Sequence, residues 1–141
     1  MIPLSLAEIA AATGGRIDGD GADPERPVDG PVVVDSREVA PGALFVAVPG
    51  ERVDGHDFAA AAVEQGARAV LATRPVGVPA VVVDDTVSAL GKLAGLVVRR
   101  LATPDGLAVV GVTGSQGKTS TKDLIASVLE TAGATIAPPG A

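Results

Sequence analysis

The residues best suited to chemistry lie in "GVTGSQGKTSTKD", positions 111 to 123. Gly114 and Gly117 allow the backbone to turn its N–H groups inward, and Lys118 can reach phosphate oxygens. The hydroxyl of Thr119 can bind magnesium. A predicted helix begins near Gly117, so its free N–H groups and its positive dipole end point at the same place.

The same stretch departs from the standard phosphate-binding loop at one position. The pattern G-x-x-x-x-G-K-[ST] requires a glycine where Val112 stands. A short apolar run, "LAVVGV", precedes the loop, and apolar residues at helical spacing follow it, which is the context that such a loop needs. We interpret the stretch as a nucleotide-phosphate site. The alternative is a glycine-rich turn whose lysine is a surface charge.

A second group of polar side chains follows a predicted strand in "VVVDSREVAPG", residues 32 to 42. Ser36 and Arg37 come directly after the apolar residues, where side chains can project from the edge of a sheet into a cleft. Arginine offers a planar set of donors for a phosphate or a base carbonyl, and a flat face for stacking. On the residues alone, an exposed ion pair between Asp35 and Arg37 in a turn is the simpler interpretation.

The only histidine, His56, lies in the polar stretch "ERVDGHDF" between a predicted strand and a predicted helix. Nothing here supplies a nucleophile for it to activate, so a role as general base has no support. A contact with a diphosphate and a hydrogen bond that fixes the loop are both open for it. Asp54 and Gly55 are most simply a turn.

Two phenylalanines and one pair of aspartates complete the candidates. We expect Phe58 in the core because it opens the apolar face of its helix, whereas Phe45 lies in the strand beside the candidate site around Arg37. Asp84 and Asp85 could form a metal-binding pair. They stand at the start of a predicted helix, however, where capping is the better explanation.

Alternating helix and strand signals organise the N-terminal part of the chain. Ser5 and Glu8 form a capping box that opens a helix, and Asp57 can cap a second helix that Gly66 ends. The turn-forming residues 18 to 31 predict a surface loop. The expected helices are 6–13 and 57–65, and the expected strands are 32–34, 43–48, 67–72 and 79–85.

These elements predict an α/β fold in three parts. Residues 1–85 form a small α/β domain, and residues 86–106 form a connecting helix followed by the turn "TPDG". Residues 107–141 form the opening strand, loop and helix of a second domain with a parallel sheet. Its strand is expected at 107–112, and its helix extends to about Gly133.

Composition restricts the class of protein. Hydrophobic residues make up 47% of the 141-residue chain and aromatic residues 1%, so the core must consist of Val, Leu, Ile and Ala. The absence of cysteine excludes disulfides and thiolate sites, and no apolar run reaches the roughly 18 residues of a membrane span. The net charge of -6 argues against a nucleic-acid-binding surface. We expect a cytoplasmic protein that binds neither nucleic acid nor membrane.

Three stretches together resemble the Mur ligase family, whose members add amino acids to the peptide of the peptidoglycan precursor. "GVTGSQGKTSTKD" is similar to the ATP loop of this family. "VVVDSREVAPGALFVAVPG" and "DGHDFAAAAVEQGARAVL" are similar to its uridine-nucleotide-binding N-terminal domain. The resemblance covers the whole chain, but the chain covers only the opening part of the family pattern. We therefore expect it to be inactive alone.

The resemblance implies an ATP-dependent ligase that also requires Mg²⁺. Ser115, the pair Thr121-Lys122 and the segment "TIAPPG" are most similar to the member that adds D-alanyl-D-alanine to UDP-N-acetylmuramoyl-tripeptide. The member that adds the third amino acid is the alternative. In this family ATP phosphorylates the carboxylate at the end of the peptide, and the incoming amine displaces phosphate from the acyl phosphate. We expect a monomer.

The resemblance also implies roles for individual residues. Lys118 would stabilise charge on the transferring phosphoryl group and Thr119 would hold magnesium, so both are expected to be catalytic. Ser36 and Arg37 would lie beside the uracil and ribose. The expected ATP-binding residues are Gly114, Ser115, Gln116, Gly117, Lys118, Thr119 and Ser120, and the expected UDP-binding residues are Ser36, Arg37, Phe45, Asp54, Gly55 and His56.

Two other classes of protein stay open from the sequence. The chain could be a non-catalytic UDP-binding or protein-interaction module, or part of an unrelated P-loop kinase or NTPase. Recognition of uridine separates the kinase or NTPase from the other two classes, because such an enzyme has no reason to bind uridine.

Overall fold

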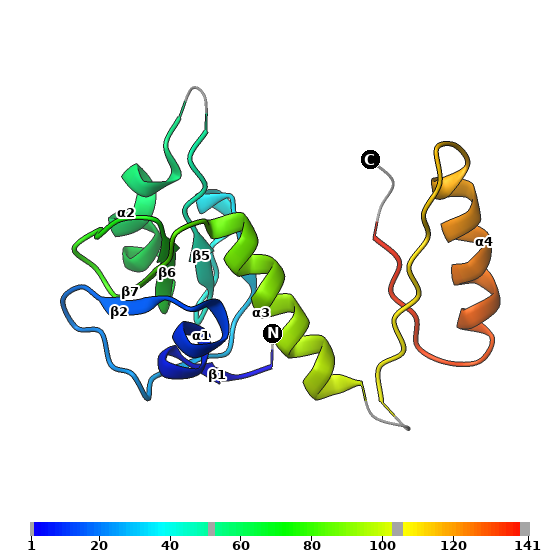
Figure 1. Cartoon of the computed structure of the whole chain (residues 1–141), viewed down its shortest axis with the longest axis horizontal. Coiled ribbons are helices and arrows are strands. Elements are labelled where there is room, and N and C mark those ends of the chain that lie inside the picture. Colours follow the sequence, from blue (N-terminus) through cyan, green and yellow to red (C-terminus); the bar gives the residue numbers. More distant parts are fainter. Residues whose placement is uncertain (1, 51–52, 103–105, 139–141) are drawn as a thin grey trace. The chain divides into compact units, whose positions relative to one another are not determined.

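A computed structural model describes residues 2–50, 53–102 and 106–138 of the chain (Figure 1). The chain divides into two units, Met1–Gly106 and Leu107–Ala141, and each is described by itself. The first unit is a sheet with helices packed around it, and the described residues of the second form the helix α4 and extended chain.

The N-terminal helix shows how local sequence determines the first element. β1 (Leu4–Ser5) leads directly into α1 (Leu6–Thr13). The Ser5 hydroxyl accepts a hydrogen bond from Glu8 N at 3.2 Å, and Glu8 Oε2 accepts one from Ser5 N at 2.8 Å. The predicted capping box is therefore confirmed, and the helix ends near the predicted residue.

A mostly parallel sheet forms the centre of the first unit. Among the described residues its strand order is β2-β7-β6-β5-β4, with β4 to β7 parallel and β2 antiparallel at one edge. The prediction of a loop at residues 18 to 31 is wrong in part, because the end of β2 and all of β3 lie there and β3 pairs with β1. The strands are β2 (Arg16–Asp18), β3 (Pro27–Val28), β4 (Val32–Val33), β5 (Leu44–Val46), β6 (Ala69–Ala72) and β7 (Ala80–Val82).

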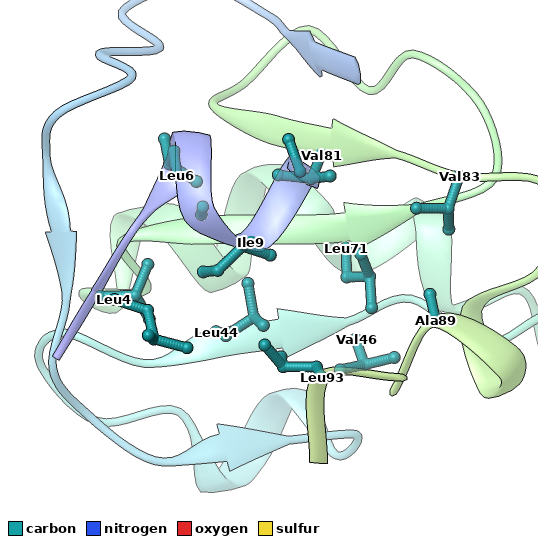
Figure 2. Packing of buried hydrophobic residues seen from close by; sticks show 13 residues of the cluster. Leu4, Leu6, Ile9, Leu44, Val46, Leu71, Val81, Val83, Ala89 and Leu93 are labelled. Atoms are coloured by element: carbon teal, nitrogen blue, oxygen red, sulfur yellow. The ribbon is translucent and has the colours of Figure 1, made fainter. Parts of the chain in front are cut away.

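Side-chain alternation along the strands produces a hydrophobic core on each face of the sheet. Leu44 and Val46 of β5 point into one core, and Phe45 points into the other. The first core, shown in Figure 2, packs the sheet against α1 and α3 (Thr86–Leu101). The second core lies against α2 (Ala59–Glu64) and is rich in alanine. The result is a layered α/β arrangement, so the predicted fold class is confirmed.

The helix α3, predicted to connect two domains, is present over its predicted residues and packs within the first unit. It packs against α1. Arg100 Nη2 donates to Glu8 Oε1 at 2.6 Å, and Lys92 Nζ donates to the carbonyl oxygen of Thr13 at 3.2 Å. Lys92 thereby satisfies a carbonyl group in the last turn of α1, which has no partner within its own helix.

Aspartate side chains cap three helical segments among the described residues, and two of these caps bear on the sequence predictions. Asp85 accepts a hydrogen bond from a first-turn amide of α3 at 2.6 Å, which confirms the capping explanation for this residue. The prediction that Asp57 caps the second helix is wrong. A 3₁₀ turn, η2 (Gly55–Phe58), precedes α2, and Asp54 caps this turn by accepting from His56 N at 3.0 Å. Aspartate commonly bonds the backbone two residues ahead in this way, which competes with an α-helical start.

The two phenylalanines lie in different environments, and the expectation for Phe58 is wrong. Phe45 is 1% exposed in the second core, whereas Phe58, which was expected in the core, is 39% exposed. Strand alternation turns Phe45 inward, and α2 begins only after Phe58. The buried side chains of α2 are instead Ala59 and Ala62.

The second unit forms its predicted helix but not its predicted strand. The helix α4 (Lys118–Glu130) follows Gly117 directly. Residues 107 to 112 form no strand in the structure. A strand needs a hydrogen-bonded neighbour, and the described part of this unit offers none. Consequently α4 has no buried residue, and Leu124 and Val128 are 70% and 69% exposed.

Candidate functional site

The carboxyl ends of β4, β5, β6 and β7 meet at one edge of the sheet because these strands are parallel. In open α/β sheets this is the edge where ligands bind. The loop after β4 carries Ser36 and Arg37, whereas the loops after β5 and β6 bring Asp54 and His56 together with Thr73 and Arg74, two residues that were not predicted. Polar residues that follow these strands include Asp35, Ser36, Arg37, Asp54, His56, Thr73, Arg74 and Asp84.

Arg37 is turned toward its own loop. It lies in the 3₁₀ turn η1 (Ser36–Glu38), where its Nε donates to Asp35 Oδ1 at 2.9 Å and its Nη2 donates to Asp35 Oδ2 at 2.5 Å. This is the ion pair that the residues alone favoured. The Arg37 side-chain bonds, followed by the bond from its backbone N–H, lower the pKa of the Asp35 carboxyl to about 2. Because the Arg37 side chain is 87% exposed, an incoming anion or carbonyl could replace Asp35.

His56 lies inside a hydrogen-bonded cluster. It is 5% exposed, its Nδ1 lies 2.5 Å from Asp54 Oδ1, and its Nε2 accepts a hydrogen bond from Thr73 N at 2.9 Å. Both ring nitrogens are therefore engaged by the protein itself. This arrangement matches the loop-fixing hydrogen bond, one of the two roles that were open for this residue.

Asp54 is held by several donors at once. Its Oδ2 accepts from Arg74 Nη1 at 2.7 Å, and Arg74 Nη2 lies 3.7 Å from Asp57 Oδ1. The hydrogen bond from the His56 backbone, followed by that from Arg74, lowers the pKa of the Asp54 carboxyl below its ordinary value. Both carboxylate oxygens of Asp54 are thus bonded within the loop cluster.

Gly55 stands where two backbone segments approach closely. Its N–H donates to the carbonyl oxygen of Val48 at 3.1 Å, just beyond the end of β5. A Cβ at this position would lie 2.8 Å from both the backbone nitrogen and the carbonyl oxygen of Val48, closer than Cβ atoms are found. The predicted turn is therefore a tight crossing over the strand end, and it requires glycine.

Thr73 and Arg74 are functional candidates that sequence reasoning missed. They follow the apolar residues of β6 directly, which is the same signal that identified Ser36 and Arg37 after β4. Thr73 also lines an open cleft of about 430 Å³ at this edge, together with Arg16 and Asp84. The 17-residue separation between His56 and Thr73 explains why their contact was not predicted.

In the second unit, the candidate phosphate loop adopts a backbone that its glycines permit. Gly114 and Gly117 have φ angles of 156° and 75°, which residues with side chains rarely adopt. Lys118 Nζ donates to the carbonyl oxygen of Gly114 at 2.7 Å, so the lysine lies across its own loop. No side chain caps α4, which leaves its first-turn N–H groups for another acceptor. The remaining predicted phosphate-binding residues are exposed: Ser115, Gln116, Thr119 and Ser120.

The side chains that could bind a metal ion do not cluster in the described residues. These residues contain no cluster of three or more His, Cys, Asp or Glu side chains that could hold a metal ion. The exposed Thr119 hydroxyl at the start of α4 fits a magnesium ion whose other ligands are phosphate oxygens and water. Across residues 2–50, 53–102 and 106–138, no helix has both the length and the apolar character that crossing a membrane requires.

The first unit has a mostly parallel sheet with polar loops at the carboxyl ends of its strands. The second has a glycine-lysine-threonine loop that opens a helix. Together these features define a class of α/β proteins that hold phosphorylated ligands. Residues 31–102 match the family model described as "Mur ligase family, catalytic domain", and residues 112–141 match the one described as "Mur ligase middle domain". The chain belongs to the Mur ligase family, which confirms the resemblance seen in the sequence.

Individual relatives match this chain over 71% to 99% of its length. The UDP-N-acetylmuramoyl-tripeptide–D-alanyl-D-alanine ligase of Mycobacterium tuberculosis is 46% identical over 99% of this chain and 32% of its own length. MurF from Acinetobacter baumannii superimposes with a TM-score of 0.78 at 33% identity, covering 92% of this chain and 28% of that one. MurF ligase from Thermotoga maritima in complex with ADP gives a TM-score of 0.62 at 40% identity, covering 71% and 23%. The predicted similarity to MurF is confirmed, and the chain spans about a third of the length of such relatives.

Proposed function

We propose that this chain is the N-terminal portion of an ATP-dependent ligase that adds D-alanyl-D-alanine to UDP-N-acetylmuramoyl-tripeptide during synthesis of the peptidoglycan precursor. The observation that carries the proposal is the alignment of one such ligase with 99% of the chain, so that the sheet unit and the phosphate loop match together. The MurF structure that contains ADP supports ATP as the nucleotide.

The first unit supplies the site for the uridine nucleotide at the carboxyl edge of the sheet. Arg37 exchanges Asp35 for the nucleotide, because its guanidinium is exposed and already arranged around an anionic partner. Ser36, which precedes it, offers a hydroxyl to the uracil or ribose. Asp54, Gly55 and His56 shape the adjacent loop. Phe45 supports the strand from within the core, because at 1% exposure its side chain does not reach a ligand.

The second unit supplies part of the ATP site. Backbone N–H groups of the loop from Gly114 to Gly117 and of the first turn of α4 hold the β- and γ-phosphates. Lys118 exchanges the carbonyl of Gly114 for a phosphate oxygen, and Thr119 offers its hydroxyl to magnesium, which when bound neutralises charge on the phosphates. Residues 1–85 would then be the substrate domain, 86–106 the connection and 107–141 the start of the ATP domain.

The reaction transfers a phosphoryl group from ATP to the terminal carboxylate of the peptide. Lys118 stabilises the negative charge on this group during the transfer. The amine of D-alanyl-D-alanine then forms the amide bond at the activated carbon, and phosphate leaves. Since the residues assigned here bind the uridine nucleotide and phosphate but not the incoming dipeptide, the chain alone binds substrate without catalysis. Its nucleotide substrates favour a cytoplasmic location, and we propose a monomer.

A calorimetric titration of the chain with UDP, UDP-N-acetylmuramoyl-tripeptide and ATP tests the uridine site. We expect both uridine compounds to bind and ATP to bind weakly. Arg37→Ala should weaken UDP binding about tenfold or more, because it removes hydrogen bonds from a charged donor. Circular dichroism confirms that each chain is folded. A folded chain that ignores both uridine compounds would overturn the proposed substrate site.

The phosphate loop is tested in the whole protein that carries this chain. Lys118→Ala should abolish ligation while the affinity for the UDP-linked substrate stays within about twofold, because the two sites lie in different units. Lys122→Ala is the matched control, since this lysine lies one turn further along α4 and bonds the carbonyl oxygen of Pro138 at 2.5 Å. A variant at Lys118 that loses ligation and UDP-substrate binding together would contradict the assignment of two sites.

A further inference from the structure

The arrangement around His56 fixes which ring nitrogen carries the proton. The Thr73 backbone N–H can only donate a hydrogen bond, so His56 Nε2, 2.9 Å away, must be the acceptor. The remaining proton then lies on Nδ1, which donates to Asp54 Oδ1 at 2.5 Å. The ring is therefore a neutral bridge with one donor and one acceptor, each used by a different segment of the chain.

The bridge joins two loops that leave neighbouring strands. On one side, Asp54 belongs to a pair of antiparallel arms after β5: Pro49 pairs with Asp54, and Gly50 N donates to the carbonyl oxygen of Val53 at 3.1 Å. We call these arms, Pro49–Gly50 and Val53–Asp54, the paired arms. On the other side, Thr73 directly follows β6. The imidazole thus ties the base of the paired arms to the end of β6.

Arg74 holds the same arms from the outside. Its guanidinium bonds Asp54 Oδ2 at 2.7 Å and lies 3.7 Å from Asp57, and its side chain is 52% exposed. His56, in contrast, is buried at 5% exposure. The inner bond is shielded from water and the outer one is not, so His56 contributes more to holding the arms than Arg74 does.

The position of the arms matters because β5 and β4 are adjacent parallel strands. Their carboxyl ends open onto the same edge, so the paired arms after β5 stand beside the loop after β4 that carries Ser36 and Arg37. We propose that His56 is a positioning residue for the nucleotide site: it sets the distance between the paired arms and the end of β6, and so fixes one wall of that site. This inference rests on the proposed uridine-nucleotide function.

Two substitutions test the two hydrogen bonds of the His56 ring one at a time. His56→Asn keeps an N–H donor near the position of Nδ1 and loses the acceptor for Thr73. His56→Gln keeps an oxygen near the position of Nε2 and loses the donor for Asp54. We expect UDP affinity to fall about tenfold in His56→Asn, which releases the arms from β6, and about threefold in His56→Gln, where Arg74 still holds Asp54.

Hydrogen exchange and nuclear magnetic resonance supply readouts that a loss of stability alone would not produce. In the parent chain, the ¹⁵N signals of His56 should show a protonated Nδ1 and an unprotonated Nε2. In His56→Asn, the Thr73 amide should exchange faster than in His56→Gln. Arg37→Ala is the matched control, since it should weaken UDP binding with no change in exchange at Gly55 or Thr73.

The outcomes separate this inference from the function on which it rests. If the parent chain does not bind UDP, the proposed function fails and the inference fails with it. If the parent binds UDP and both His56 variants bind it equally well, only the inference is overturned; the opposite ring tautomer would also overturn it. Should the His56 variants prove unfolded by circular dichroism, hydrogen exchange in the parent chain decides the matter. Bound UDP should slow exchange of the Thr73 amide, because the bridge and the nucleotide stabilise the same arrangement, and exchange that UDP leaves unchanged would refute the positioning role.

Discussion

The first unit, Met1–Gly106, and the second, Leu107–Ala141, contain similar local signals but differ in packing. Leu71 of β6 is 0% exposed, whereas Leu124 of α4 is 70% exposed, although both stand at apolar positions of a predicted element. A helix closes its hydrogen bonds within its own segment, but a strand closes them only with a neighbour. The second unit therefore forms its helix without a hydrophobic core, whereas the first unit forms helices, strands and a core.

The largest expected effect comes from deleting one leucine side chain in each unit. Leu71→Ala should lower the free energy of unfolding by about 2–5 kcal/mol, because it leaves a cavity in a packed core. Leu124→Ala should change it by less than about 0.5 kcal/mol, since the side chain is already in water. Urea unfolding followed by circular dichroism measures both values. Equal losses in the two variants would show that the second unit has a core of its own.

A glycine in each unit tests backbone packing in the same way. Gly55→Ala should destabilise the first unit by about 1–3 kcal/mol, because the new Cβ would overlap the backbone of Val48. Gly111→Ala in the second unit meets no atom within 4 Å and should be neutral to within about 0.5 kcal/mol. Thermal unfolding of the two variants compares them. A tolerated Gly55→Ala would mean that the crossing over β5 is looser than described.

Sequence signals within one segment predicted structure best. The capping box of Ser5 and Glu8 and the cap at Asp85 are local features, and each is present. The start of α2 failed because Asp54 and Asp57 offered two competing caps, and the chain uses the first for a 3₁₀ turn. The strand at residues 107 to 112 failed because its apolar pattern says nothing of whether a neighbour exists.

The candidate site was predictable up to the point where distant segments meet. Ser36 and Arg37 were singled out because they directly follow an apolar strand, and His56 because it is the only histidine and lies in a polar loop. The contact of His56 with Thr73 spans 17 residues and depends on the pairing of β5 with β6, which no local pattern encodes. The same limit applies to Phe45, which is buried because α2 covers its face of the sheet, a contact between segments that no local pattern shows.

One serine associated with a helix in each unit provides a smaller test. Ser5→Ala should destabilise the first unit by about 1 kcal/mol, because it removes the side-chain cap of α1. Ser127 of α4 donates to the carbonyl oxygen of Asp123 within its own helix, at 3.0 Å, and Ser127→Ala should be nearly neutral. Urea midpoints of the two variants give the difference. A loss at Ser127 as large as that at Ser5 would contradict the contrast between the units.

The smallest expected effect concerns how each unit holds the cation of its candidate site. Arg37 is held by the carboxylate of Asp35, whereas Lys118 is held by a carbonyl oxygen, so a titratable partner is present only in the first unit. Arg37→Ala should raise the pKa of Asp35 from about 2 toward its ordinary value near 4. Because the folded-state pKa is lowered, the stabilisation from this pair is present above the ordinary value and is lost as the pH falls to about 2.

A pH titration of the Asp35 carboxyl ¹³C resonance measures this shift, and Lys118→Ala is the control that should leave it unchanged. The backbone N–H of residue 37 still donates to Asp35 in Arg37→Ala, because only the side chain is removed. A pKa that stays near 2 without the guanidinium would therefore assign the lowering to the backbone bond. In that case the Arg37 side chain would not be bound to Asp35 in solution, and it could bind a nucleotide without first breaking that ion pair.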